Sequence, residues 1–240
     1  CSFCGSSAMW GKKVRFRSPD NVVGEIKEMM EKYRVRSFRF QDDTMTLNKK
    51  HLEELCSKLS PLGIKWRTTT RVDKVNFGIL NMVKQAGCDE VGYGIESLCQ
   101  EVLDKNAKKI KISQIYEALE NTARVGLKTR LFFIVGLPGE PLGFTQRLGD
   151  FLQKTNPEGV DISTMVPYPG SPLFHHPEKY GIQLKGQNHF EKYHMTLGFI
   201  ESEVDRPLTF IHDILSEEEI IEERKNSLEL IKKRKMVKNF

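Results

Sequence analysis

The chain has 240 residues and a formal net charge of +5, with 39% hydrophobic and 29% charged residues. This length and apolar content suffice for one large or two small folded domains. No apolar run approaches the roughly 18 residues of a membrane span, and no segment resembles a secretory signal. The five cysteines are odd in number, with Cys1 and Cys4 close together and the other three scattered, which argues against a secreted disulfide framework. We therefore expect a cytoplasmic protein that does not enter a membrane.

Basic residues are concentrated at positions 12–17 and 232–238. Such clusters can form a nucleic-acid-binding surface. The second run, however, ends a predicted helix that begins with glutamates at 217–219, and this polarity matches the helix dipole. An ordinary solvated helix is therefore favoured, and we expect no nucleic-acid partner.

Short β-prone runs alternate with amphipathic helical stretches, a pattern typical of parallel strands joined by helical crossovers. The predicted strands are residues 37–41, 65–70, 90–95, 129–135 and 160–166. The predicted helices are residues 22–30, 52–59, 79–86, 115–122 and 144–152. No Rossmann glycine fingerprint follows the first strand, so a barrel or partial barrel is favoured within the α/β class.

Beyond Pro167 the pattern becomes loop-rich, and Ser216 then begins a final helix with Glu219 completing a capping box. We therefore predict a core at residues 1–170 and a C-terminal extension at 171–240. The loops after the strands and the segment 174–213 are expected to shape a substrate pocket.

A polar or glycine-containing segment follows each predicted strand. These segments contain Asp42, Asp43 and Thr44; Arg71; Glu96 and Ser97; Gly136, Pro138, Gly139 and Glu140; and Pro167 and Tyr168. In parallel barrels such segments share one rim, where barrel enzymes place their active sites.

Cys1 and Cys4 form a Cys-x-x-Cys pair whose thiolates can share one metal centre. Alone, this spacing is equally typical of a zinc half-site or a redox couple. A zinc site needs a second pair of ligands at matching spacing, which the sequence lacks, and a thioredoxin-type couple would not be followed by the rim segments. His175 and His176 are interpreted as surface or substrate-side residues, whereas Cys56 and the Met29–Met30 pair are expected in the core.

Taken together, these segments resemble the radical S-adenosylmethionine (SAM) superfamily. Residues 1–4 (CSFC) resemble the last two cysteines of the signature Cys-x-x-x-Cys-x-aromatic-Cys, with Phe3 as the aromatic residue and the first cysteine expected four residues before Cys1. The order and spacing of four further segments also match: QDDTMT at 41–46, GYGIES at 92–97, FIVGLPGE at 133–140 and VPYPGSPL at 166–173. The resemblance covers residues 1–175 and implies a partial (β/α)6 TIM-like barrel that lacks its first strand.

The resemblance also implies cofactors and partners. Three cysteine thiolates hold a [4Fe-4S] cluster with one open iron, which binds SAM. An external electron donor such as flavodoxin or ferredoxin would reduce the cluster. The most similar subgroup, methyltransferases and anaerobic tetrapyrrole cyclases, has a cobalamin-binding domain before the radical SAM core. Cobalamin is therefore a candidate third cofactor, held by a domain upstream of residue 1.

The resemblance assigns roles to the rim residues. Phe3 would lie near the adenine, Asp42, Asp43 and Thr44 would bind the methionine amino group, and Glu96 would contact the ribose. Ser97, which follows Glu96, is a further cofactor-binding candidate. Arg71 would pair with Glu96 or with the SAM carboxylate. Gly136, Pro138 and Gly139 would let the backbone approach the adenine, and Pro167 and Tyr168 would form a loop over the nucleotide.

Each role has a structural alternative. Asp43 or Thr44 could cap the following helix, Glu96 could form a surface salt bridge, Arg71 could be solvated, and the glycines could serve only a tight turn. Two alternative functions also stay open. One is a zinc-bearing or basic nucleic-acid-binding module, and the other is a metal-free barrel enzyme using Asp42, Asp43 and Glu96 as acid and base. The sequence does not identify the substrate, for which we expect a small molecule or a peptide.

Overall fold

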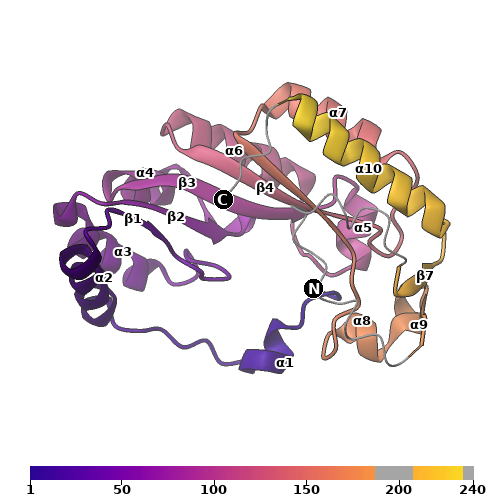
Figure 1. The fold of residues 1–240 in the computed structure, drawn as a ribbon, viewed down its shortest axis with the longest axis horizontal. Coiled ribbons are helices and arrows are strands. Elements are labelled where there is room, and N and C mark those ends of the chain that lie inside the picture. The colour runs from indigo at the N-terminus through magenta and orange to yellow at the C-terminus, as the bar shows by residue number, and fades with distance from the viewer. Residues whose placement is uncertain (187–207, 235–240) are drawn as a thin grey trace. The chain divides into compact units, whose positions relative to one another are not determined.

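The computed structural model describes residues 1–186 and 208–234 and contains a sheet of five parallel strands (Figure 1). They are β1 (Ser37–Arg39), β2 (Lys65–Thr70), β3 (Cys88–Glu96), β4 (Lys128–Val135) and β5 (Gly159–Thr164). All five predicted strands are confirmed, with ends that differ from the prediction by two residues or fewer. The strand order is the chain order, which is typical of barrels and differs from the reversed order of doubly wound folds.

The predicted helices are confirmed as well. They are α2 (Pro19–Tyr33), α3 (Lys49–Leu59), α4 (Phe77–Gln85), α6 (Ile112–Arg124), α7 (Phe144–Thr155) and α10 (Glu217–Lys233). Ser216 caps α10 through the expected capping box with Glu219. Among the described helices, none combines the length and apolar content that a bilayer span needs. Residues 235–238 of the second basic run lie outside the described residues.

Several short elements were not predicted from the sequence. They are α1 (Ser6–Trp10), α5 (Gln100–Lys105), α8 (Pro172–His175), α9 (Pro177–Tyr180), the 3-10 turns η1 (Ser60–Leu62) and η2 (Val72–Lys74), and the antiparallel pair β6 (Ile182–Leu184) and β7 (Phe210–His212). Each has fewer than two helical turns or only three strand residues, too few to show a hydrophobic period. Residues 187–207, part of the segment predicted to shape a pocket, lie outside the described residues.

The chain divides into two compact units. The first contains Cys1–Lys13, Ile95–Ile112 and Phe132–Phe240, and the second contains Val14–Gly94 and Ser113–Leu131. β3 and β4 each run from the second unit into the first.

In the second unit, large side chains of β2 and β3 form a buried core. The indole of Trp66 is fully buried and donates to the carbonyl of Ala86 at 2.7 Å, and the hydroxyl of Tyr93 is hydrogen-bonded to Thr122 at 2.8 Å. Cys56 is buried, as predicted. Of the Met29–Met30 pair, Met29 is 37% exposed and Met30 is half-buried, so the predicted core position of Met29 is wrong. The buried side chains of α2 follow Val23 and Ile26, and Met29 lies off this stripe.

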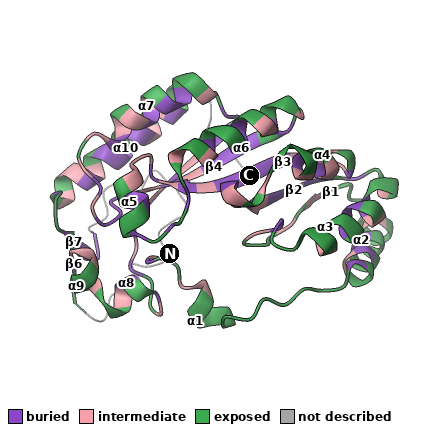
Figure 2. Cartoon of the chain, turned by 180° about the vertical axis from the view of Figure 1, so that it is seen from behind, coloured by how far each residue is buried: buried purple, intermediate pink, exposed green. Residues whose placement is uncertain are grey.

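In the first unit, α10 packs along α7, and the buried stretches of both helices are purple in Figure 2. The buried residues of α7 are Phe144, Leu148, Phe151 and Leu152. The buried side of α10 combines apolar, polar and charged residues, which are Ile220, Glu223, Arg224, Ser227 and Ile231. Buried charges need partners, and the partners of Glu223 lie at the start of α7.

Candidate functional site

A buried serine fixes the loop that carries the two N-terminal cysteines. Cys1 and Cys4 are exposed, whereas Ser2 is only 1% exposed. The backbone N–H of Ser2 donates to the carbonyl of Asn106 at 2.9 Å, and its hydroxyl donates to Asn106 Oδ1 at 2.7 Å. The carbonyl of Ser2 accepts from the N–H of Leu173 at 2.9 Å. The cysteine pair is therefore held in place while both thiols stay accessible.

Asn106 connects this loop to the turn that follows β4. Its amide Nδ2 donates to the carbonyls of Val102 and Pro138, both at 2.9 Å, while Oδ1 accepts from Ser2. Asn106 is fully buried, so these hydrogen bonds replace the ones that its amide would otherwise make with water. Sequence reasoning missed both Ser2 and Asn106, because nothing in a single sequence marks two distant polar residues as a buried pair.

The loop after β5 lies against the residues that follow Cys4. A Cβ added at Gly5 would lie 3.6 Å from the carbonyl oxygen of Pro169 and 3.9 Å from Cβ of Tyr168. Gly170 has a φ of +85°, and a Cβ there would lie 2.5 Å from Cβ of Ala8. The predicted nucleotide-side loop containing Pro167 and Tyr168 is therefore a direct neighbour of the residues that follow the cysteine motif, and each of the two segments has a glycine at the contact.

Glu96, the last residue of β3, forms a largely buried ion pair. Its Oε1 lies 2.7 Å from Nζ of Lys108, and the two side chains are 12% and 8% exposed. Glu96 has a φ of +70°, and Ala107 and Lys109, on either side of Lys108, have φ values of +50° and +55°. Left-handed backbone costs a non-glycine residue about 1–2 kcal/mol. Glu96 does form a salt bridge, as the structural alternative predicted, but the pair is largely buried and is not at the surface. Its residues lie on or beside backbone with positive φ.

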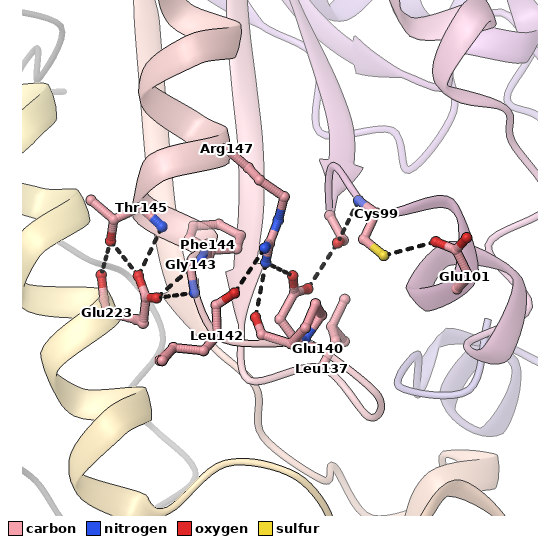
Figure 3. A network of polar contacts seen from close by, with 12 residues as sticks. Cys99, Glu101, Leu137, Glu140, Leu142, Gly143, Phe144, Thr145, Arg147 and Glu223 are labelled. Carbon is pink, nitrogen blue, oxygen red and sulfur yellow. Dashed lines mark hydrogen bonds and ion pairs between the residues drawn. The ribbon is translucent and has the colours of Figure 1, made fainter.

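Ser97 joins the end of β3 to the turn after β4. Its hydroxyl donates to Oε2 of Glu140 at 2.8 Å, and Arg147 Nη2 donates to Oε1 of the same carboxylate at 2.6 Å (Figure 3). Burial of Glu140 raises its pKa, and the hydrogen bond from Ser97 and the charge of Arg147 act in the opposite direction. Arg147 also donates to the carbonyls of Pro141 and Leu142. The network locks the two segments to each other.

The turn after β4 requires its glycines. Gly136 and Gly139 have φ values of +79° and +84°. A Cβ at Gly136 would lie 3.1 Å from Cγ2 of Ile220, and one at Gly139 would lie 2.8 Å from Cδ of Lys105. The tight-turn interpretation of these glycines therefore holds. A close approach of the same backbone to adenine stays a prediction.

In the second unit, Asp42, Asp43 and Thr44 begin three residues after the end of β1, and both aspartates are exposed. The carbonyl of Asp42 accepts from the hydroxyl of Thr69 at 2.7 Å, which fixes the start of the segment. Asn48 caps α3 by accepting from the N–H of His51 at 3.1 Å. The alternative that Asp43 or Thr44 caps this helix is therefore wrong.

Arg71, also in the second unit, follows β2 and is partly buried. Its Nε donates to Oδ1 of Asp73 at 2.8 Å, so the guanidinium is not simply solvated. Its pairing with Glu96 or with the SAM carboxylate stays a prediction.

The first unit therefore brings together most of the predicted site residues. They are Cys1, Phe3, Cys4, Glu96, Ser97, Gly136, Pro138, Gly139, Pro167 and Tyr168, while Asp42, Asp43, Thr44 and Arg71 belong to the second unit. His175 and His176 are exposed, as expected for surface residues. Within residues 1–186 and 208–234, no three His, Cys, Asp or Glu side chains gather as metal ligands.

Curated relatives and solved structures are similar to much of this chain. It is 31% identical over 176 residues to an uncharacterized methyltransferase of Pyrococcus horikoshii, covering 72% of this chain and 38% of the relative. It is 30% identical over 178 residues to an anaerobic magnesium-protoporphyrin IX monomethyl ester cyclase of Rubrivivax gelatinosus, covering 72% and 32%. The chain thus spans less than two fifths of the length of these relatives.

The fold resembles that of the radical SAM methyltransferase TsrM from Kitasatospora setae, whose structure contains cobalamin and a [4Fe-4S] cluster. The TM-score is 0.68 at 15% identity, over 78% of this chain and 40% of TsrM. The cobalamin-dependent radical SAM enzyme OxsB gives a TM-score of 0.57 at 17% identity, over 75% of this chain and 27% of OxsB. The predicted fold class, a partial TIM-like barrel, is confirmed by these neighbours. The sequence model of the radical SAM superfamily matches residues 1–149, and this match, over more than half of the sequence, shows that the chain belongs to the radical SAM superfamily.

Proposed function

We propose that this chain is the part of a larger enzyme that binds a [4Fe-4S] cluster and SAM, and that it forms a 5'-deoxyadenosyl radical or supports cobalamin-dependent methyl transfer. The observation that carries the proposal is the hydrogen-bonded link from Ser2 through Asn106 to Pro138. This link joins the exposed cysteine pair to the glycine turn that the family motif associates with the adenosyl group.

Cys1 and Cys4 fit two of the cluster ligands. Both thiols are exposed at Cys-x-x-Cys spacing, and we expect the third ligand four residues before Cys1. The N–H of Ser6 donates to Sγ of Cys4 at 3.5 Å, the kind of contact that tunes cluster potentials. Cys1 and Cys4 would hold the cluster together with the third cysteine, and the bound cluster would supply the electron for reductive cleavage of SAM.

The protein's own residues would bind and orient SAM. Lys108 pairs with one oxygen of Glu96, and a carboxylate has lone pairs for further donors, so Glu96 can also accept from ribose hydroxyls. The carboxylates of Asp42 and Asp43 suit the methionine ammonium group. We expect the backbone of residues 136–139 to contact the adenine on a side other than the one where Ile220 and Lys105 fill the space beside Gly136 and Gly139.

The wider setting of the enzyme follows from its relatives. We infer that a cobalamin-binding domain precedes the core, because TsrM and OxsB are named with cobalamin and the relatives include methyltransferases and cyclases. We also infer a cytoplasmic location, a flavodoxin or ferredoxin as reductant, and a small-molecule or peptide substrate. The division into a core at 1–170 and an extension at 171–240 belongs to the same proposal.

The test uses the full-length protein, reconstituted without oxygen. We expect on the order of four iron atoms per chain, a change of the cluster's electron paramagnetic resonance signal when SAM is added, and 5'-deoxyadenosine when dithionite is present. Cys4→Ser should abolish all three, whereas the control Cys99→Ser should retain them. Asn106→Ala should retain the iron but raise the KM for SAM, because it cuts the link to Pro138.

Two results would contradict the proposal. Uptake of one zinc and no iron would favour the zinc module, especially with salt-dependent RNA binding. Activity that survives replacement of both Cys1 and Cys4 by alanine would favour a metal-free enzyme.

A further inference from the structure

C-terminal residues surround the turn after β4 and the start of α7. Ile220 of α10 packs against Gly136, with its Cγ2 3.1 Å from the position of an added Cβ. His212 Nε2 lies 2.9 Å from the carbonyl oxygen of Leu137. Asp213 pairs with Lys105 at 2.8 Å, and the stem of Lys105 covers Gly139. These contacts come from residues 208–231, which lie outside the 1–149 match to the family.

Glu223 of α10 supplies the N-terminal cap of α7, which Gly143 at the cap position cannot supply because it has no side chain. The Glu223 carboxylate accepts from the N–H groups of Gly143, Phe144 and Thr145 at 2.5, 3.1 and 2.8 Å (Figure 3). The hydroxyl of Thr145 donates to the same carboxylate at 2.5 Å. A carboxylate here also complements the positive end of the helix dipole.

His212 is held in one tautomer by its surroundings. Its Nδ1 accepts from the N–H groups of Ile214 and Leu215 at 3.1 and 3.0 Å. Nε2 must therefore carry the hydrogen and donate it to the carbonyl of Leu137. The side chain is fully buried, so this bond is shielded from water.

We propose that residues 208–231 form a C-terminal clasp that holds residues 136–145 in the conformation that binds the adenosyl part of SAM. This inference rests on the proposed function. Glu223 and His212 are its positioning residues. The segment that they hold contains three glycines with positive φ, at 136, 139 and 143, and glycine has the most conformational freedom to lose. Without the clasp, fewer molecules would have the binding conformation, and the apparent affinity for SAM would fall by that fraction.

The test replaces Glu223 by alanine and compares the exposed neighbour Glu222→Gln on the same helix. Hydrogen bonds to a charged group are strong enough that Glu223→Ala should weaken SAM binding about tenfold or more. We expect the dissociation constant and the KM for SAM to rise while kcat stays unchanged. Amide hydrogen exchange in residues 137–145 should accelerate in the protein without SAM. Glu222→Gln should change neither readout more than about twofold.

A milder variant guards against loss of folding. Thr145→Val removes the hydroxyl bonded to Glu223 but leaves the backbone N–H groups in place, and it should give the same pattern at smaller amplitude. Faster exchange with unchanged SAM affinity would overturn the inference and leave only a structural cap. If the wild-type protein binds no SAM, the proposed function fails and this inference fails with it, so the two failures are distinguishable.

Discussion

Replacing Lys108 by methionine should strongly destabilise the protein, because it leaves the carboxylate of Glu96 buried without its cation. The two side chains are 8% and 12% exposed and their charged atoms lie 2.7 Å apart. Removing one partner of a buried pair costs about 3–5 kcal/mol, whereas a surface pair contributes about 0–1 kcal/mol. At about 2–4 °C per kcal/mol for a chain of this size, the unfolding midpoint should fall by roughly 6–20 °C.

The assay is thermal unfolding of the wild type, Lys108→Met, Glu96→Gln and the double variant. Replacing both charges removes the unpaired carboxylate, so the double variant should be more stable than Lys108→Met alone. A midpoint shift of less than about 3 °C for Lys108→Met would fall within the range of a surface pair. That result would refute the argument that burial gives this pair its importance.

Three further predictions concern thiols, glycines and pH. Alkylation near neutral pH should label Cys4 quickly and Cys56 slowly, because burial raises the pKa of Cys56 to about 12 while Cys4 is exposed; equal labelling by peptide mass spectrometry would contradict this. Gly136→Ala should lower the free energy of unfolding, measured by denaturant titration, by about 1–2 kcal/mol because the φ of Gly136 is +79°. Gly24→Ala inside α2 should raise it by about 0.5–1 kcal/mol, and the opposite order of the two variants would disprove the argument that the turn requires Gly136. Burial alone would raise the pKa of Glu223, but the hydrogen bonds from its cap partners lower it below 4.5. The stability difference from Glu223→Gln should therefore be constant above that pH and shrink as pH falls through the folded-state pKa, and a difference unchanged at about pH 3 would be inconsistent with it.

The sequence predicted the elements that repeat a hydrophobic period. α6 and α7 contain several turns each, and their buried stripes are readable as apolar residues at helical spacing. α8 and β6 have four and three residues, and so they contain no complete period. Met29 was misplaced because an apolar residue beside a stripe looks the same in sequence as one within it.

The residues of the candidate site also differ in whether the sequence could predict them. Glu96 and Gly136 were predicted because they sit in motifs at the ends of strands, where parallel topology brings segments together. Asn106, Lys108 and Glu223 were not predicted, since their importance comes from partners that are distant or on irregular backbone. The partners of Glu223 are about 80 residues away in sequence, and only the fold shows that this glutamate, in an otherwise ordinary acidic helix, is buried.

The turn after β4 is held from both ends of the chain. Asn106 ties Pro138 to the N-terminal cysteine loop, while His212 ties Leu137 to the C-terminal clasp. Adjacent carbonyls of one turn thus accept from two different parts of the molecule. A turn with two glycines at positive φ has little conformational preference of its own. Its shape is therefore set by these external donors, so residues that bind no cofactor can still determine how well the motif binds one.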